Sequence, residues 1–238
     1  MITRVTFFAL AFMLTACVGT ASAGPNQGGT ILLHYNLDII GCEGSWCGLV
    51  ALSDCEEAVV TMPGSIPGGA GVIGPWFVFA AFPTGSHPRM AATNFGIDYD
   101  PSQVFPMVYL PCSDRSEMTA SPAWPSPGSG VSLAWNTART ASLDIIYYFY
   151  GYGYQGETVS LTPHPILGGT FSDDAVPPHV DAIAGYGTLG FGVDGVRACP
   201  EAIGACCDPD GSCLFTNGPG RYVHQVSLPI ALHKQRGI

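Results

Sequence analysis

Short apolar runs alternate with turns rich in glycine and proline along most of the chain. The runs predict strands at residues 30–35, 48–52, 58–62, 76–82, 90–99, 103–109, 131–135, 143–154, 158–162 and 183–192. Short strands at this spacing indicate an all-β fold and favour an antiparallel β-sandwich. Only residues 113–120 permit a helix, and their periodicity is weak.

Two runs predict how deeply their strands are buried. Residues 76–82 are apolar without interruption, which is typical of a strand buried on both faces. In residues 94–99, Phe95, Ile97 and Tyr99 alternate with Asn94, Gly96 and Asp98. This alternation predicts a strand with one buried and one solvated face.

The strongest strand pattern, at residues 143–154, holds a run of aromatic residues. Tyr148, Tyr150, Tyr152 and Tyr154 fall on one face of the strand, and the residues between them fall on the other. One interpretation is an aromatic platform that stacks on sugar rings. The other, which is commoner for aromatic residues in strands, is that the rings fill the core or support each other across strands. These four tyrosines are the candidate ligand-binding residues.

The first 23 residues resemble an export signal. Arg4 precedes an apolar run at residues 5–14, which is too short to span a bilayer, and Ala21-Ser22-Ala23 places small residues before a cleavage site at Gly24. This predicts a secreted, extracellular protein. The residues 14–17, Leu-Thr-Ala-Cys, leave open an alternative in which the chain is anchored through a lipid on Cys17. No later stretch has the length and apolarity of a transmembrane helix.

Composition divides the rest of the chain into three parts. We expect a β-sandwich domain at 24–198, a Cys-rich module at 199–218 and a basic tail or terminal strand at 219–238. Residues 221–238 contain no acid, in contrast to everything before them. That contrast leaves open whether these residues are the natural ending of the protein.

The charge distribution excludes some partners. Residues 24–218 contain all 18 acids, four arginines and no lysine. Such a surface repels the phosphates of nucleic acid and of anionic lipid. Polysaccharides, surface proteins and cations remain as partners, and the oligomeric state is open.

An even number of cysteines remains after the signal, which in an exported chain predicts disulfide bonds rather than a zinc site. Their spacing lacks the paired CxxC motifs of structural zinc sites. It does not determine which cysteines form disulfides with each other. The candidates are Cys42, Cys47, Cys55, Cys112, Cys199, Cys206, Cys207 and Cys213.

Signatures of catalysis and of cofactor binding are weak. Two glycine patterns, at 151–156 and 185–190, match the dinucleotide-binding spacing, but strand-like residues and proline follow where that motif needs a helix. The sequence has no GxSxG or HExxH motif, so it gives no support for an enzymatic activity. We expect no cofactor; a calcium ion is the alternative, with Asp173 and Asp174 as its candidate site. The acidic pairs Asp98 with Asp100 and Asp208 with Asp210 have similar spacing, and such pairs are commonest in plain turns.

Several segments resemble uncharacterised exported proteins of environmental bacteria. They are residues 28–36, 76–100, 151–165, 168–192 and the Cys-rich stretch GACCDPDGSC at 204–213. Residues 94–104, NFGIDYDPSQV, are similar to the strand and turn of cohesin-type sandwiches, which occur in surface and polysaccharide-associated assemblies. The resemblance implies an immunoglobulin-like or cohesin-like sandwich and no known activity.

Export, the strand pattern and the tyrosine run together favour a non-catalytic binding or adhesion module for polysaccharide or protein. A structural subunit of an extracellular assembly is the second hypothesis, because a weakly charged chain with edge strands can self-associate. A secreted hydrolase with an unrecognised site is the third, and a pocket with convergent acids or histidines would distinguish it.

Overall fold

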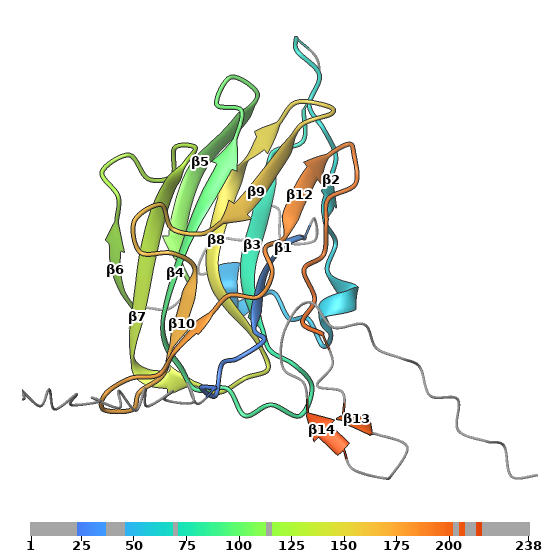
Figure 1. Cartoon of the computed structure of the whole chain (residues 1–238). Coiled ribbons are helices and arrows are strands. Elements are labelled where there is room, and N and C mark those ends of the chain that lie inside the picture. The colour runs from blue at the N-terminus through green and yellow to red at the C-terminus, as the bar shows by residue number, and fades with distance from the viewer. Residues whose placement is uncertain are drawn as a thin grey trace, which may run out of the picture.

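The computed structural model describes residues 23–36, 46–68, 71–112, 116–201, 205–207 and 213–215. Two β-sheets pack face to face as a sandwich, which confirms the predicted fold class (Figure 1). The four-stranded sheet has the order β1-β3-β8-β5, with every neighbouring pair antiparallel. Its strands are β1 (Thr30–Tyr35), β3 (Gly74–Ala81), β8 (Leu143–Gly153) and β5 (Val104–Pro111).

The second sheet has eight strands. They follow the order β11-β10-β4-β9-β12-β2, and β7 pairs with β4 and carries β6 at its other edge. The pairs are antiparallel except β12 with β2. The strands are β2 (Thr61–Met62), β4 (Met90–Tyr99), β6 (Ser116–Ala120), β7 (Ser129–Arg139), β9 (Thr158–Thr162), β10 (Thr170–Ser172), β11 (Val180–Ala182) and β12 (Thr188–Phe191).

Backbone hydrogen bonds connect the two sheets at one edge. Ile31 of β1 donates to the carbonyl of Gly185 and accepts from Gly187, at 3.0 and 2.8 Å. These bonds form a parallel bridge between β1 and the segment that leads into β12. One edge of the sandwich is therefore partly closed, whereas β5 lies at the opposite edge of its sheet.

Two apolar clusters lie on opposite faces of the four-stranded sheet. The larger one fills the space between the sheets and includes Trp76, Val78, Tyr147 and Phe149. In the smaller one, Val50, Ala58 and Val60 pack with Phe77 and Phe79 on the outer face. β3 is buried along its whole length, which confirms the prediction for residues 76–82.

Two disulfides hold the outer segment that contributes to the smaller cluster. Cys47 in the 3-10 helix η2 (Trp46–Gly48) bonds to Cys112, and Cys55 in the 3-10 helix η3 (Cys55–Glu57) bonds to Cys199. Cys42 lies outside the described residues. Cys206, Cys207 and Cys213 belong to a two-stranded hairpin, β13 (Ala205–Cys207) with β14 (Cys213–Phe215), whose backbone alone is described.

The sequence-based assignments differ from the structure in several places, and of the predicted strand 58–62 only Thr61–Met62 is a strand. Residues 48–52 form no strand: disulfides tether both ends of this segment, and Val50 packs in the smaller cluster. The helix-permissive stretch 113–120 contains strand β6, whose pairing with β7 outweighs its weak helical pattern. Only Thr188–Phe191 of the predicted strand 183–192 is a strand, and the three-residue strands β10 and β11 were not predicted.

The predicted export signal and basic tail lie almost wholly outside the described residues. Within the described parts, no helix has the length and apolarity needed to cross a membrane. Both glycine patterns of the dinucleotide type lie in strands and turns, and no helix follows either of them in the described chain. At Gly151 an added Cβ would lie 2.1 Å from the Phe105 carbonyl oxygen, so close backbone contact explains this glycine.

Candidate functional site

The aromatic run on β8 divides between the core and the outer face, as strand alternation predicted. Tyr147 and Phe149 are fully buried between the sheets. Tyr148, Tyr150, Tyr152 and Tyr154 lie on the other face and are half-buried. Because they face away from the second sheet, these four rings are outside the core that joins the layers.

One end of the tyrosine row is covered by Trp46. The centroid of its indole lies 5.3 Å from that of Tyr148 and 4.8 Å from that of Tyr150, and both pairs are tilted. Trp46 precedes Cys47, so the Cys47–Cys112 disulfide keeps it beside β8. The sequence pattern did not identify Trp46, because its neighbours on β8 are far away in the chain.

The other end of the row packs against Phe105 of β5. Phe105 and Tyr152 face each other in the strand register, and their rings stack with a centroid distance of 4.9 Å and an angle of 24°. Tyr154 contacts both Phe105 and Tyr152 edge-on. The rings therefore support one another across strands, which was part of the alternative interpretation of the sequence.

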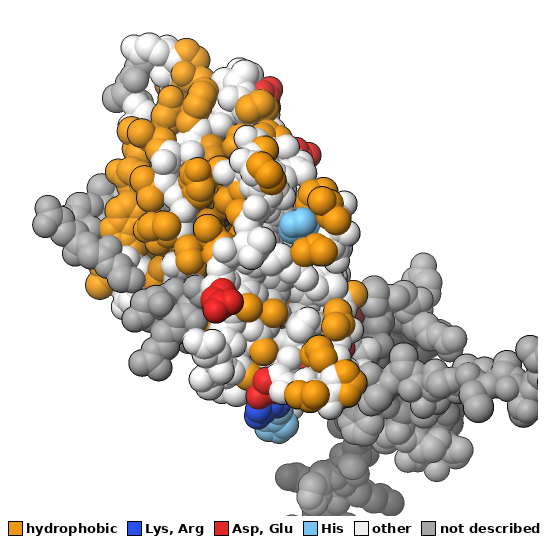
Figure 2. All heavy atoms as spheres, turned by 90° about the vertical axis from the view of Figure 1, so that its left-hand side faces the viewer, with side chains coloured by type: hydrophobic (Ala, Val, Ile, Leu, Met, Phe, Trp, Pro, Cys, Tyr) orange, Lys and Arg blue, Asp and Glu red, His pale blue; other side chains and the backbone are white. Residues whose placement is uncertain are grey.

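Exposed apolar side chains continue from the tyrosines onto β5. Met107 is 60% exposed, Val108 40% and Leu110 48%. Figure 2 views the side of the sandwich at which β5 lies and shows hydrophobic side chains gathered over a continuous area. We call this surface the aromatic face: Trp46, Phe105, Met107, Val108, Leu110, Tyr148, Tyr150, Tyr152 and Tyr154.

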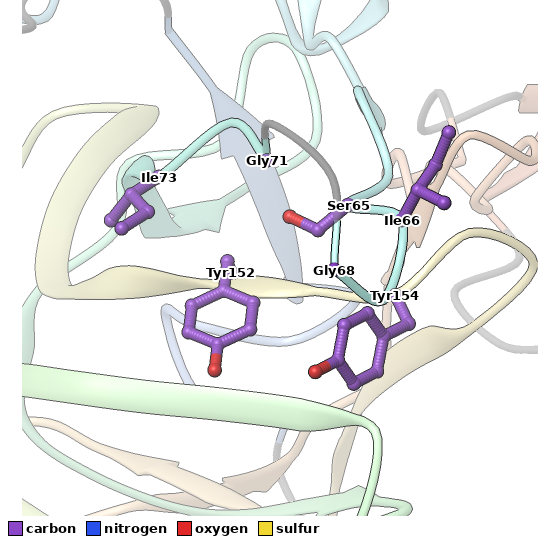
Figure 3. A pocket seen from close by; sticks show the side chains of 7 residues that line it. All are labelled: Ser65, Ile66, Gly68, Gly71, Ile73, Tyr152 and Tyr154. Carbon is purple, nitrogen blue, oxygen red and sulfur yellow. The ribbon is translucent and has the colours of Figure 1, made fainter.

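A pocket of about 280 Å³ opens at the end of the aromatic face (Figure 3). Tyr152 and Tyr154 line one side, and Ser65, Ile66 and Ile73 line the other, together with Gly68 and Gly71. Ser65 is buried, and its hydroxyl has no hydrogen-bond partner in the described structure. The pocket thus combines aromatic and aliphatic walls.

A second hollow, of about 400 Å³, lies between η3 and the turn after β3. Asp54, Glu56 and Ser86 are among its lining residues, and no histidine lines it among the described residues. The Asp54 carboxylate caps η3 by accepting a hydrogen bond from the Glu56 backbone nitrogen at 3.2 Å. The Ser53 hydroxyl, also in the lining, donates to the Glu57 carboxylate at 2.7 Å.

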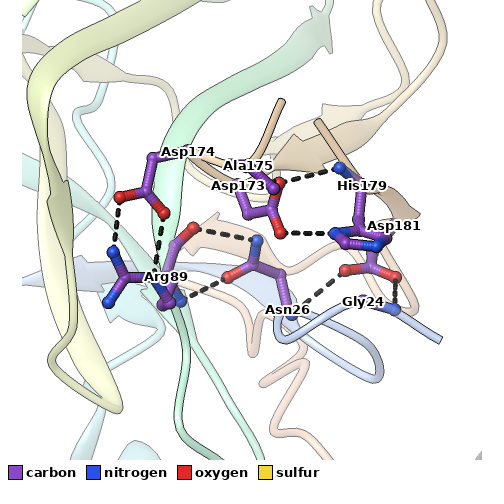
Figure 4. Close-up of polar contacts among 8 residues, drawn as sticks. All are labelled: Gly24, Asn26, Arg89, Asp173, Asp174, Ala175, His179 and Asp181. Atoms are coloured by element: carbon purple, nitrogen blue, oxygen red, sulfur yellow. Dashed lines mark hydrogen bonds and ion pairs between the residues drawn. The ribbon is translucent and has the colours of Figure 1, made fainter. Parts of the chain in front are cut away.

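The two acids predicted to bind calcium point to different partners (Figure 4). Asp174 pairs with the guanidinium of Arg89, whose Nε lies 2.8 Å from Oδ1, and this hydrogen bond lowers the pKa of the carboxyl. Asp173 accepts from the backbone nitrogens of Ala175 and His179 and contacts the His179 ring at 2.7 Å. Burial acts to raise the pKa of Asp173, but these hydrogen bonds lower it.

These contacts occupy both carboxylates. The described residues contain no cluster of three or more histidine, cysteine, aspartate or glutamate side chains suited to a metal ion. Calcium binding at Asp173 and Asp174 therefore stays a prediction from sequence.

Comparison with known proteins gives similarities of fold only. No protein-family model matches the sequence, and no curated protein matches it. The chain is similar to the cohesin module of a family 33 glycoside hydrolase from Clostridium perfringens, at 8% identity and a TM-score of 0.43, covering 74% of this chain and 99% of that one. It is also similar to a type I cohesin–dockerin complex from Clostridium thermocellum, at 10% identity and a TM-score of 0.37, covering 56% and 89%. In the second of these structures a cohesin is in complex with a dockerin.

Proposed function

We propose that this chain is a non-catalytic extracellular module that binds a protein partner through the aromatic face. The observation that carries the proposal is the continuity between the exposed apolar residues of β5 and the half-buried tyrosines of β8. Contiguous apolar surface on a soluble domain marks a site where another molecule binds. Tyrosine, tryptophan, phenylalanine and methionine, all present here, are the apolar residues enriched in protein interfaces.

The arrangement of the rings favours a protein over a polysaccharide. Phe105 stacks on the ring of Tyr152, and Trp46 packs against the rings of Tyr148 and Tyr150. These neighbours cover part of the ring surface that a sugar would stack on. The exposed side chains of Met107, Val108 and Leu110 offer no hydrogen bond to a sugar hydroxyl. An apolar protein surface needs no such bonds.

The pocket beside Tyr152 and Tyr154 provides an anchor point for that partner. Binding energy in protein interfaces concentrates where one large side chain fills a desolvated pocket. Ile66 and Ile73 supply apolar walls opposite the rings of Tyr152 and Tyr154. These groups suit a large apolar side chain.

The test compares two matched variants of the oxidised chain that begins at Gly24. The chain is immobilised and exposed to extracellular proteins of its source, and a captured protein is then purified and titrated. Leu110→Asp places a charge on the aromatic face and should weaken binding by about tenfold or more. Val180→Asp makes the same kind of change on edge strand β11 of the other sheet, where Val180 is 60% exposed, and should leave binding unchanged.

Other results would assign another function. Equal binding by both variants would contradict the proposed location. Retention on insoluble polysaccharides that is lost in a folded Tyr150→Ala/Tyr152→Ala variant would identify sugar as the ligand. Concentration-dependent oligomers that Leu110→Asp abolishes would instead identify the chain as a structural subunit of an assembly.

A further inference from the structure

Asp181 on β11 is a buried carboxylate with no cation beside it in the part of the chain that the structure describes. Only 7% of the residue is exposed. Oδ1 accepts a hydrogen bond from the Gly24 backbone nitrogen at 2.9 Å, and Oδ2 accepts one from the Asn26 nitrogen at 3.0 Å (Figure 4). The ion pairs found among the described residues involve other acids, namely Asp144, Asp173 and Asp174. Both carboxylate oxygens are held by backbone N–H donors, and a positive group at one of these donors would strengthen the contact.

Hydrogen bonds hold residues 24–29, the segment that contacts Asp181, in place. Asn26 is fully buried, and its side-chain amide both donates to the carbonyl of Arg89 at 3.2 Å and accepts from the nitrogen of Arg89 at 2.9 Å. Turn bonds from Gln27 to Gly24 and from Gly29 to Asn26 connect this segment to the start of β1. These contacts hold the Gly24 nitrogen against the carboxylate.

Position 24 has no room for a side chain. A Cβ on Gly24 would lie 2.3 Å from Oδ2 of Asp181, whereas Ala23 is exposed. The same glycine follows Ala21-Ser22-Ala23, the small residues that the sequence predicts before a cleavage site. The close approach of Asp181 to position 24 and the predicted cleavage site before it are independent observations, and both concern the Gly24 nitrogen.

The geometry points to Gly24 as the mature N-terminus, with its ammonium group forming an ion pair with Asp181. A signal peptidase adds one water across the Ala23–Gly24 peptide bond. Ala23 takes the new carboxylate, and the Gly24 nitrogen leaves as an amine that gains a proton from water. The nitrogen that donates one hydrogen bond as an amide then carries three hydrogens and a positive charge beside the buried carboxylate. Processing thus completes the site and stabilises the folded chain.

The pair should make stability depend on pH in the alkaline range. A free α-amino group has a pKa of about 7.7–8.0, and a neighbouring carboxylate raises it in the folded state. The stabilisation is therefore complete below about pH 7.7 and is lost as pH rises through the raised value. The other charged groups drawn around the site, Arg89 with Asp174 and His179 with Asp173, are already paired with each other.

The first measurement is a thermodynamic cycle. Chains that begin at Gly24 and at Ala23 are compared, each with and without Asp181→Asn. We expect the chain that begins at Gly24 to melt about 2–4 °C higher, and Asp181→Asn to remove this difference. Equal melting temperatures for the two starting residues, or an equal effect of Asp181→Asn in both, would overturn the inference.

The second measurement does not require the variant to fold. Lys234 is the single lysine of the sequence, so the chain beginning at Gly24 has two amines, and mass spectrometry can follow acylation of each. We expect the Gly24 amine of the folded chain to react about tenfold more slowly than in urea, relative to Lys234. Absence of this protection would contradict the ion pair, as would an exported chain that starts at a lipid-modified Cys17.

Discussion

The indole nitrogen of Trp124 donates a hydrogen bond of 2.9 Å to the phenol oxygen of Tyr147, and both side chains are buried between the sheets. Trp124 lies between β6 and β7 of one sheet, and Tyr147 belongs to β8 of the other. Burial raises the pKa of the Tyr147 phenol, so it stays neutral over the whole range in which the protein is studied. This hydrogen bond therefore joins the two layers inside the core.

Tyr147→Phe should destabilise the sandwich by about 1–3 kcal/mol, because it leaves the buried indole N–H of Trp124 without an acceptor. Urea unfolding of the two chains measures the change. Tyr150→Phe is the matched control, since its ring is half-buried on the outer face and no hydrogen bond involves its hydroxyl in the described structure; it should change stability by less than about 0.5 kcal/mol. Equal effects of the two substitutions would contradict the role of the Trp124 contact.

The contrast between Tyr147 and Tyr150 shows what could be predicted from sequence. Alternation along a strand is a local property, so the division of the run into two faces followed directly from residue order. The burial of 76–82 on both faces was also predictable, because a continuous apolar run has no solvated side. Which face met the second sheet was not, because that depends on where the other strands lie.

The parts of the site that sequence reasoning missed depend on distant contacts. Trp46 joins the aromatic face through a disulfide, and eight cysteines allow far too many pairings for sequence to select one. Phe105 joins it through the register of β5 with β8, and a bulge near Pro106 shifts that register. Asp181 lies in a strand of three residues, which carries too little pattern to be recognised.

The two disulfides should differ in their contribution to stability. Cys55–Cys199 spans 144 residues and Cys47–Cys112 spans 65, so the first restricts the unfolded chain more. Replacing the cysteines of either pair by alanine should cost about 2–4 kcal/mol, with the longer loop costing about 0.7 kcal/mol more. Urea unfolding of the two double variants tests the order. A larger loss for the Cys47–Cys112 pair would mean that packing of Trp46 outweighs chain entropy.

Gly153→Ala should destabilise the core by about 1–3 kcal/mol through overpacking. A Cβ at this position would lie 2.4 Å from the ring of Phe191, which is fully buried and packs edge-on against Trp76. Gly48→Ala is the control, because nothing lies within 4 Å of the added methyl group. Thermal unfolding should separate the two variants, and equal melting temperatures would show that Phe191 moves aside without cost.

The buried histidine of β1 should make stability fall under acidic conditions. His34 lies beneath the outer segment, where its Nδ1 accepts a hydrogen bond from the Val59 nitrogen at 3.0 Å, and burial lowers its pKa to about 4. The ordinary pKa of histidine is 6.5, so the unfolded chain takes up this proton first as pH falls. The stabilisation is then complete above about pH 6.5 and decreases toward pH 4, by up to about 3 kcal/mol.

The variant His34→Asn tests this dependence. Its amide oxygen can accept the same bond and nothing titrates, so its free energy of unfolding should change less with pH over this range. His87→Asn, at an exposed turn residue, should keep the slope of the unsubstituted chain, and an unchanged slope in His34→Asn would assign the acid sensitivity to the carboxylates instead.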